Sequence, residues 1–232
     1  MSFLPQYIFS YKVIILLREI FSKTKLYKKI FHKSYQFNFH PSQIVLFCNL
    51  LKEASRINGS IVEVGCNTGS TTLFLNKYLE SLNSNKIYYA LDTFNGFPKE
   101  DILFEENKRG KKKGMYKDAF KMNSLKLFEE RMSVNNLKNV KAISCDVKDF
   151  NFSDIAPFSF VLLDVDLYKP IKNVLVKIFP LMSPGGIIVV DDCNKDSQMW
   201  DGAYQAFKEF VEENNLESEI ILDKIGLIKI QK

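Results

Sequence analysis

Residues 61–70 constrain the fold of this chain more strongly than any other segment. A short apolar run carries a carboxylate at Glu63, turns through Gly65 and Gly69, and passes at Ser70 into a segment with helical periodicity. Glycine lets a backbone approach a ligand where a Cβ would clash, and the start of a helix offers free N–H groups. The segment therefore indicates a strand, a ligand-binding turn and a helix in direct succession.

The chemistry of this turn narrows the choice of ligand. Its glycine spacing differs from the Gly-x-Gly-x-x-Gly of dinucleotide-binding turns, and it lacks the Gly-Lys-Ser/Thr of a Walker loop. The carboxylate of Glu63 would repel a phosphate, whereas it suits a ligand that carries an ammonium and a sulfonium. Asp92, at the end of the next expected strand, suits the two hydroxyls of a ribose. Asp146, after the third strand, could reach an adenine amino group, although a solvated turn fits the sequence nearly as well.

After residue 40, apolar runs alternate with segments of helical periodicity. Strands are expected over residues 60–65, 87–91, 140–144, 158–165, 187–190, 219–222 and 227–230. Helices are expected between residues 40 and 58 and over residues 70–82, 119–134, 171–181 and 200–213, whereas residues 93–118 look irregular and polar. The expected fold is α/β: a Rossmann-like, doubly wound, mostly parallel seven-stranded sheet with a C-terminal antiparallel hairpin.

Four carboxylates follow the fourth and fifth expected strands. Asp164 and Asp166 come after one strand, and Asp191 and Asp192 come after the other. Because neighbouring parallel strands end side by side, these carboxylates would converge and repel one another without a cation. Ligands that are all oxygen atoms favour Mg²⁺ or a similar hard ion. The alternative is that the four aspartates only cap helices and turns.

Residues 1–39 form an expected N-terminal extension, basic, aromatic and helical, ahead of a domain that spans residues 40–232. Residues 1–34 carry seven lysines and arginines against Glu19 alone, which is +6 of the chain's formal net charge of +5. The rest of the chain therefore has a net charge of −1, and nucleic-acid binding is not expected. The apolar run at residues 13–17 is too short for a signal peptide or a membrane span. Three interpretations remain: a helix packed on the domain or a second subunit, an amphipathic segment on an anionic membrane surface, and a flexible basic arm.

The cysteines indicate a reducing compartment. The four of them are far apart, and no histidine lies at ligand spacing from any of them: Cys48, Cys66, Cys145 and Cys193. Neither a zinc site nor a disulfide framework is expected. We therefore expect a cytoplasmic protein. We also expect a homo-oligomer, and any peripheral membrane contact would be made through residues 1–34.

Taken together, the motifs resemble those of a known family. They are Glu63-Val-Gly65 with Gly69, Asp92-Thr-Phe-Asn-Gly-Phe-Pro98, Asp164-x-Asp-Leu-Tyr168 and Gly185-Gly-x-x-x-x-Asp191-Asp192. Over residues 40–215 the chain resembles class I S-adenosylmethionine methyltransferases, and more narrowly the macrocin-type (TylF/MycF) O-methyltransferases, which methylate sugar hydroxyls. The resemblance implies a small-molecule hydroxyl acceptor and S-adenosylmethionine as the methyl donor.

The resemblance also implies roles for individual residues. Glu63 and Gly65 would hold the methionine part of the cofactor, and Asp92 its ribose. Three aspartates that bind Mg²⁺ in the family fall on Asp164, Asp191 and Asp192 here.

One departure from the family concerns the proton acceptor. The family has a histidine between the second and third strands that is proposed as the base, whereas this chain has only His32 and His40. Two alternatives could remove the proton of the acceptor hydroxyl. One is Asp166 as the base, and the other is deprotonation assisted by a metal at Asp164.

The basic run at residues 108–114 follows Asp92 and is expected to form a mobile lid over the substrate. It is either a solvated charge run or a binding site for an anionic acceptor, such as a nucleotide-linked or phosphorylated sugar. Two other function classes stay open on the same fold. They are a nicotinamide-dependent oxidoreductase and a cofactor-binding protein without catalytic activity.

Overall fold

The computed structural model describes residues 11–24 and 37–231. The chain divides into two units, residues 1–38 and residues 39–232. The first unit contains helix α1 (Tyr11–Ser22), on which Val13, Leu16 and Ile20 are exposed. No helix in the described ranges is long and apolar enough to cross a membrane.

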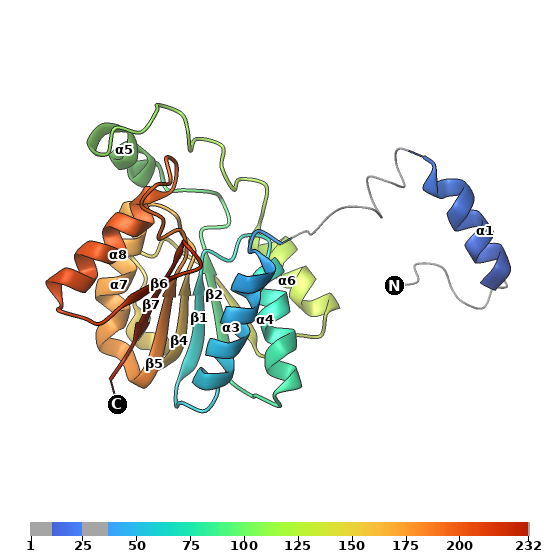
Figure 1. The fold of residues 1–232 in the computed structure, drawn as a ribbon, viewed down its shortest axis with the longest axis horizontal. Helices are drawn as coiled ribbons and strands as arrows, with labels where there is room; N and C mark the ends of the chain where they lie inside the picture. The colour runs from blue at the N-terminus through green and yellow to red at the C-terminus, as the bar shows by residue number, and fades with distance from the viewer. Residues whose placement is uncertain (1–10, 25–36, 232) are drawn as a thin grey trace. The chain divides into compact units, whose positions relative to one another are not determined.

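The second unit is built on a seven-stranded sheet with the order β3-β2-β1-β4-β5-β7-β6 (Figure 1). The strands are β1 (Ser60–Val64), β2 (Tyr88–Asp92), β3 (Val140–Ser144), β4 (Phe158–Leu163), β5 (Met182–Val190), β6 (Glu219–Ile221) and β7 (Ile225–Lys229). Strands β1 to β5 are parallel, and β7 runs antiparallel to both β5 and β6. The expected mostly parallel sheet with a terminal antiparallel hairpin is confirmed.

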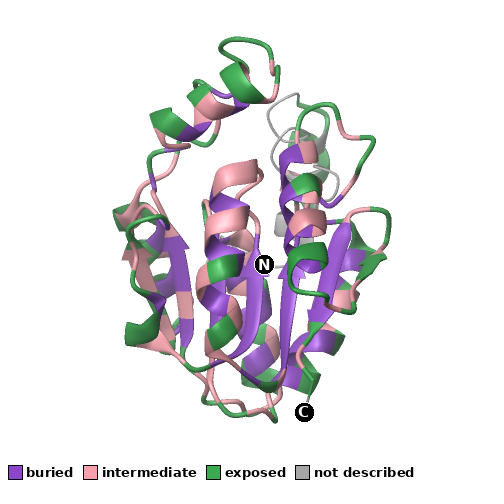
Figure 2. Cartoon of the chain, turned by 90° about the vertical axis from the view of Figure 1, so that its left-hand side faces the viewer, coloured by how far each residue is buried: buried purple, intermediate pink, exposed green. Residues whose placement is uncertain are grey.

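Helices cover both faces of the sheet. They are α3 (Pro41–Ala54), α4 (Ser70–Ser81), α6 (Leu125–Val134), α7 (Tyr168–Ile178) and α8 (Asp201–Glu213), with short 3₁₀ turns at Phe152–Ile155 and Phe179–Leu181. Helix α5 (Lys99–Lys108) instead lies beyond the ends of the strands (Figure 1). The side chains of β4 alternate, as the strand period of two requires. Val161 and Leu163 pack toward α7 and α8, whereas Phe160 and Leu162 pack toward α3 and α4. Figure 2 shows the resulting buried strands between helices with exposed outer faces.

Helix α5 lies where the sequence suggested irregular structure. Its two buried side chains are acidic, Asp101 and Glu105, so it lacks the apolar periodicity that marks the other helices. Glu105 accepts hydrogen bonds from Arg109 Nε at 2.8 Å and from the backbone N–H of Tyr168 at 2.9 Å. Phe104 stacks on the Tyr168 ring with centroids 5.6 Å apart. The hydrogen bond from Tyr168 to the buried Glu105 and one stacked ring therefore dock α5 against the start of α7.

Of the other boundaries, two differ most from expectation. Helix α6 begins at Leu125 rather than at residue 119, because Ser124 caps it by accepting a hydrogen bond from the N–H of Leu127. Strand β5 begins at Met182, so the Pro-Gly-Gly sequence expected to end a helix lies inside the strand. There Gly185 has a left-handed backbone with φ 80°, and its N–H donates to the Ile230 carbonyl at 3.1 Å.

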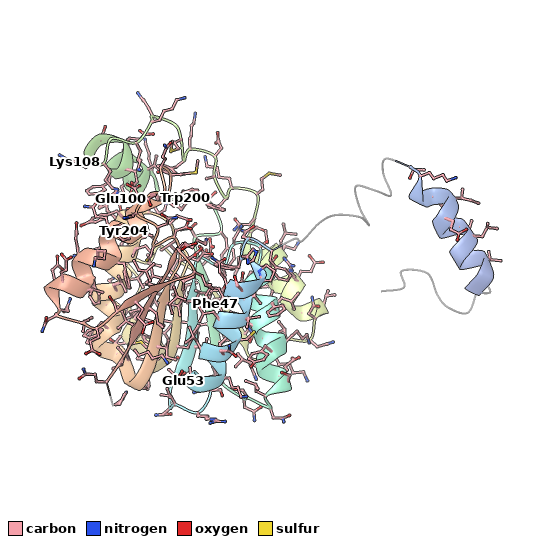
Figure 3. All side chains as sticks on the ribbon, viewed as in Figure 1. Phe47, Glu53, Glu100, Lys108, Trp200 and Tyr204 are labelled. Carbon is pink, nitrogen blue, oxygen red and sulfur yellow. The ribbon has the colours of Figure 1, made fainter. Side chains whose placement is uncertain are left out.

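The basic run after α5 is anchored in part. Arg109 pairs with Glu105 and with Asp201 at the start of α8, and Lys111 also pairs with Asp201. The rings of Tyr116 and Trp200 pack with centroids 5.4 Å apart. Figure 3 marks the outer end of α5 at Lys108 and the start of α8 near Trp200.

Replacing Glu105 with Gln should loosen α5, because it removes one of the two carboxylates that the buried Arg109 pairs with and weakens the acceptor of the Tyr168 N–H. We expect the free energy of unfolding in urea to fall by about 3 kcal/mol, a value typical of a broken buried pair. Amide exchange in α5 should also become faster. The control is Lys108→Gln at the exposed end of the same helix, with an expected change within about 0.5 kcal/mol. Equal stabilities for Glu105→Gln and the unchanged chain would show that the charge of Glu105 does not hold α5.

Candidate active site

The order of the strands reverses beside β1, which pairs with β2 on one side and β4 on the other. In open α/β sheets the crevice at the carboxyl ends of such strands binds ligands. Four residues that follow these strands have left-handed backbones without being glycine: Asn67, Phe94, Asp166 and Asp192, with φ between 45° and 61°. Such conformations cost about 1–3 kcal/mol each and gather at functional sites. The edge that they share is the candidate site.

Both glycines of the turn after β1 are required by packing. Gly65 has φ 90°, and a Cβ there would lie 1.9 Å from the carbonyl oxygen of Asp164. Gly69 has φ 77° and caps α4, and a Cβ there would lie 2.7 Å from the ring of Phe128. The next residue, Ser70, receives a hydrogen bond from Arg131 at 3.0 Å. The glycines therefore bring the turn close to both β4 and α6.

Glu63 lies beneath this turn and is buried. Its Oε2 accepts hydrogen bonds from the hydroxyls of Thr72 and, at 2.9 Å, Tyr88. Burial raises the pKa of Glu63 to about 7, although both hydroxyls oppose the rise by bonding to the charged form. The structure thus gives Glu63 a role in tying β1 to β2 and α4. Its predicted contact with the methionine part of a cofactor stays a prediction.

Asp92 joins two loops at the candidate site. Its Oδ2 accepts the N–H of Asn67 and its Oδ1 accepts the N–H of Phe94, both at 2.7 Å. Burial raises the pKa of Asp92, and these backbone donors partly offset the effect. Each carboxylate oxygen has a second lone pair, so the side chain can still accept bonds from two ribose hydroxyls.

A cavity of about 540 Å³ lies beside Asp92, at the carboxyl ends of β2 and β3. Its lining includes Thr93, Phe97, Cys145 and Asp146. This volume falls within the range of small-molecule sites, and its walls are both polar and aromatic. A larger cavity of about 710 Å³ lies at the opposite edge of the sheet, away from the aspartates.

The four aspartates come together as β4 and β5 end. Leu163 of β4 pairs with Val190 of β5, so Asp164 and Asp191 follow adjacent positions. Asp191 is 5% exposed, and its Oδ1 is buried without a hydrogen-bond partner.

Lys224 binds the same group of carboxylates. Its Nζ lies 2.8 Å from Oδ2 of Asp191 and 3.0 Å from Oδ1 of Asp192. The sequence analysis missed this lysine, because it lies in a turn between two strands and belongs to no motif.

The environment of the aspartates resists their ionisation. Burial, followed by repulsion from neighbouring carboxylates, raises the pKa of Asp164 and Asp166 well above the usual range. The same causes raise the pKa of Asp191 to about 6, with Lys224 opposing the rise. In the part of the chain that the structure describes, no three His, Cys, Asp or Glu side chains have the arrangement of a metal site. The predicted Mg²⁺ site of Asp164, Asp191 and Asp192 is therefore not preformed.

The histidines occupy other places. His40 is exposed at the start of α3, where its Nδ1 lies 2.8 Å from Ser42 Oγ. Its neighbour Phe39 lies under Lys224, with the ring centroid 5.5 Å from Nζ. The start of α3 is therefore at the aspartate edge, which its position before the first motif did not indicate. His32 lies outside the described residues.

The model of the macrocin O-methyltransferase (TylF) family matches residues 48–228. The chain belongs to this family. It is an O-methyltransferase that uses S-adenosylmethionine. This family replaces the two other function classes, a nicotinamide-dependent oxidoreductase and a cofactor-binding protein without catalytic activity. A search of curated protein sequences finds no match.

Solved structures agree with the fold of this methyltransferase. The O-methyltransferase NovP is 18% identical, over 82% of this chain and 80% of that chain, with a TM-score of 0.67. The calicheamicin methyltransferase CalS11 is 16% identical, over 94% and 91%, with a TM-score of 0.68. An apo structure of CalS11, described as a TDP-rhamnose 3'-O-methyltransferase, has a TM-score of 0.57 at 14% identity, over 94% and 93%.

Asp92→Asn should weaken binding of S-adenosylhomocysteine to the methyltransferase by about tenfold or more, because one oxygen that accepts hydrogen bonds becomes a donor. Isothermal titration calorimetry measures the affinity. The matched control is Asp118→Asn, whose side chain is 81% exposed, and its affinity should not change. An unchanged affinity in the folded Asp92→Asn protein would place the ribose elsewhere.

Proposed function

We propose that this methyltransferase methylates a hydroxyl of a sugar that carries an anionic group, with Mg²⁺ bound at the aspartate cluster (Asp164, Asp166, Asp191 and Asp192). One observation carries the proposal. The turn after β1 and the aspartates after β4 touch, since a Cβ on Gly65 would overlap the Asp164 carbonyl. A methyl donor on that turn would therefore lie next to the group that holds the acceptor. The description of CalS11 as a TDP-rhamnose 3'-O-methyltransferase supports a nucleotide-linked sugar as the acceptor class.

Residues of three strands would bind the donor. S-adenosylmethionine supplies a methyl group on a sulfonium, which is already a good leaving group, so the protein mainly aligns the two reactants and excludes water. Asp92 would accept the ribose hydroxyls, and Asp146 in the neighbouring cavity would face the adenine. The backbone at Gly65 and Gly69 leaves room for the methionine part, while Glu63 keeps β1 and α4 in register beneath it.

The aspartate cluster suits a hard divalent cation in its donor chemistry. All of its ligand atoms are carboxylate oxygens, and one of them, Oδ1 of Asp191, is buried without a partner. Asp164, Asp191 and Asp192 would hold the ion, which when bound would orient the acceptor hydroxyl and lower its pKa. Burial, followed by repulsion from Asp191 and Asp192, raises the pKa of Asp164, and a bound cation would relieve that repulsion.

Asp166 is the proposed proton acceptor, in the ionised form that a cation bound beside it would favour. It follows β4 with a left-handed backbone and lies against both Asp164 and Asp192, so its carboxyl shares the place proposed for the acceptor hydroxyl. Replacing Asp166 with Asn should lower kcat while leaving the affinity for S-adenosylhomocysteine unchanged. An unchanged kcat would leave deprotonation assisted by the metal at Asp164, Asp191 and Asp192.

An anionic acceptor is favoured by two exposed lysines. Lys111 of the basic run is paired with Asp201, whereas Lys112 and Lys113 are exposed on the segment that follows α5. Cations beside a site attract an anionic substrate over several ångströms. These two residues, rather than the whole run, are the proposed contact for the charged part of the acceptor.

The test is methyl transfer from S-adenosylmethionine with an isotopically labelled methyl group, read by mass spectrometry. A TDP-deoxysugar and the neutral methyl glycoside of the same sugar serve as acceptors. We expect the labelled methyl group on a sugar hydroxyl. Replacing Lys112 and Lys113 with Ser should raise KM for the TDP-sugar by about fivefold and leave KM for the glycoside unchanged.

The control is a double replacement of the exposed Lys126 and Lys138 with Ser, which removes the same charge near α6 and should change neither KM. Transfer to a non-sugar hydroxyl, such as a catechol, with none to either sugar would overturn the proposed acceptor class. Equal effects of the two double replacements would show that Lys112 and Lys113 are only solvated.

A further inference from the structure

Lys224 reaches the aspartate cluster from the strand on its other side. Strand β5 lies between β4, which precedes Asp164, and β7, which follows Lys224. Val190 pairs with Gly226 in the antiparallel β5–β7 ladder, so the residues just before β7 lie beside those just after β5. The fold thus brings a lysine of the last hairpin next to Asp191 and Asp192.

The position of Lys224 is fixed by several contacts. Its carbonyl oxygen accepts the N–H of Cys193 at 2.7 Å, directly after the two aspartates. Its ammonium donates to one oxygen of each aspartate, at 2.8 and 3.0 Å, and lies 5.5 Å from the Phe39 ring centroid. The side chain is only 27% exposed. A half-buried ammonium in two ion pairs is a built part of the cluster and not a surface contact.

The charges of the cluster remain unequal with Lys224 in place. Lys224 pairs with two of the four carboxylates, those of Asp191 and Asp192, and Oδ1 of Asp191 stays buried without a hydrogen bond. One fixed positive charge therefore neutralises part of the group and leaves an oxygen that can bind a second cation. Removing the lysine would make the group more negative, and a more negative set of oxygen ligands binds a divalent ion more tightly.

We propose that Lys224 is a fixed cation that shares the aspartate cluster with a divalent metal and lowers the affinity of the cluster for that metal. It acts through Asp191 and Asp192 and is therefore a positioning residue. Without it, the cluster depends on the metal for its charge balance. This inference rests on the metal part of the proposed function, and it is independent of which sugar is methylated.

The test is a titration of the full chain with Mn²⁺, followed by electron paramagnetic resonance, without methyl donor or acceptor. Lys224→Met should bind Mn²⁺ at least about tenfold more tightly than the unchanged chain, because one positive charge leaves the ligand set. Lys224→Arg keeps the charge and should bind as the unchanged chain does. Lys229→Met is the matched control, because it removes the same charge from an exposed pair with Glu53, and its affinity should not change.

Stability gives a second readout of the same idea. In EDTA the Lys224→Met protein should melt at a lower temperature than the unchanged chain, and Mn²⁺ should raise its Tm by more. A variant that is unfolded in EDTA and folds when Mn²⁺ is added also supports the proposal.

Three results would overturn it. The first is an unchanged Mn²⁺ affinity in Lys224→Met. The second is a weaker Mn²⁺ affinity in that variant, which would mean that Lys224 orients the ligands. The third is a Lys224→Met protein that stays unfolded in saturating Mn²⁺. None of these results bears on methyl transfer by the unchanged chain, so a failure here is distinguishable from a failure of the proposed function.

Discussion

The close approach of β1 and β4 at Gly65 is the contact on which the rest of the site depends. The N–H of Gly65 donates to the Leu91 carbonyl of β2, and the N–H of Asp164 donates to the Val64 carbonyl, both at 2.8 Å. With no Cβ at Gly65, the chain can leave β1 while the backbone of Asp164 passes directly against it. The turn proposed to face the methyl donor and the first aspartate of the proposed acceptor side are thereby joined through backbone.

Charge balance is the second constraint at this edge. Glu63 is buried under the turn, and Asp191 is buried within the aspartate cluster. Two carboxylates are therefore withdrawn from water at the same edge of the sheet. Hydroxyls of Thr72 and Tyr88 stabilise one, and Lys224 stabilises the other. Each of these two buried carboxylates thus has a stabilising partner, while Oδ1 of Asp191 is left without one.

Local patterns in the sequence predicted most of the fold and the aspartate edge. The strands of the parallel sheet are apolar runs with clear ends, and the carboxylates that follow them converge because parallel strands end together. Helix α5 escaped this reasoning because it is docked by the buried Glu105 and not by an apolar face. Lys224 escaped it because its role arises only when β7 inserts beside β5, a pairing between distant segments. The interpretations of residues 1–34 as a packed helix, a membrane contact or a basic arm stay predictions.

The central claim is that S-adenosylmethionine binds between the turn after β1 and Asp92. Hydrogen–deuterium exchange of the full chain, measured with and without S-adenosylhomocysteine, tests it most directly. Binding at this place should slow exchange at residues 65–70, 92–97 and 145–147. Exchange should not change at residues 55–60 and 83–87, which lie beside the larger cavity on the opposite edge. Slower exchange at that opposite edge, with none at residues 65–70, would contradict it.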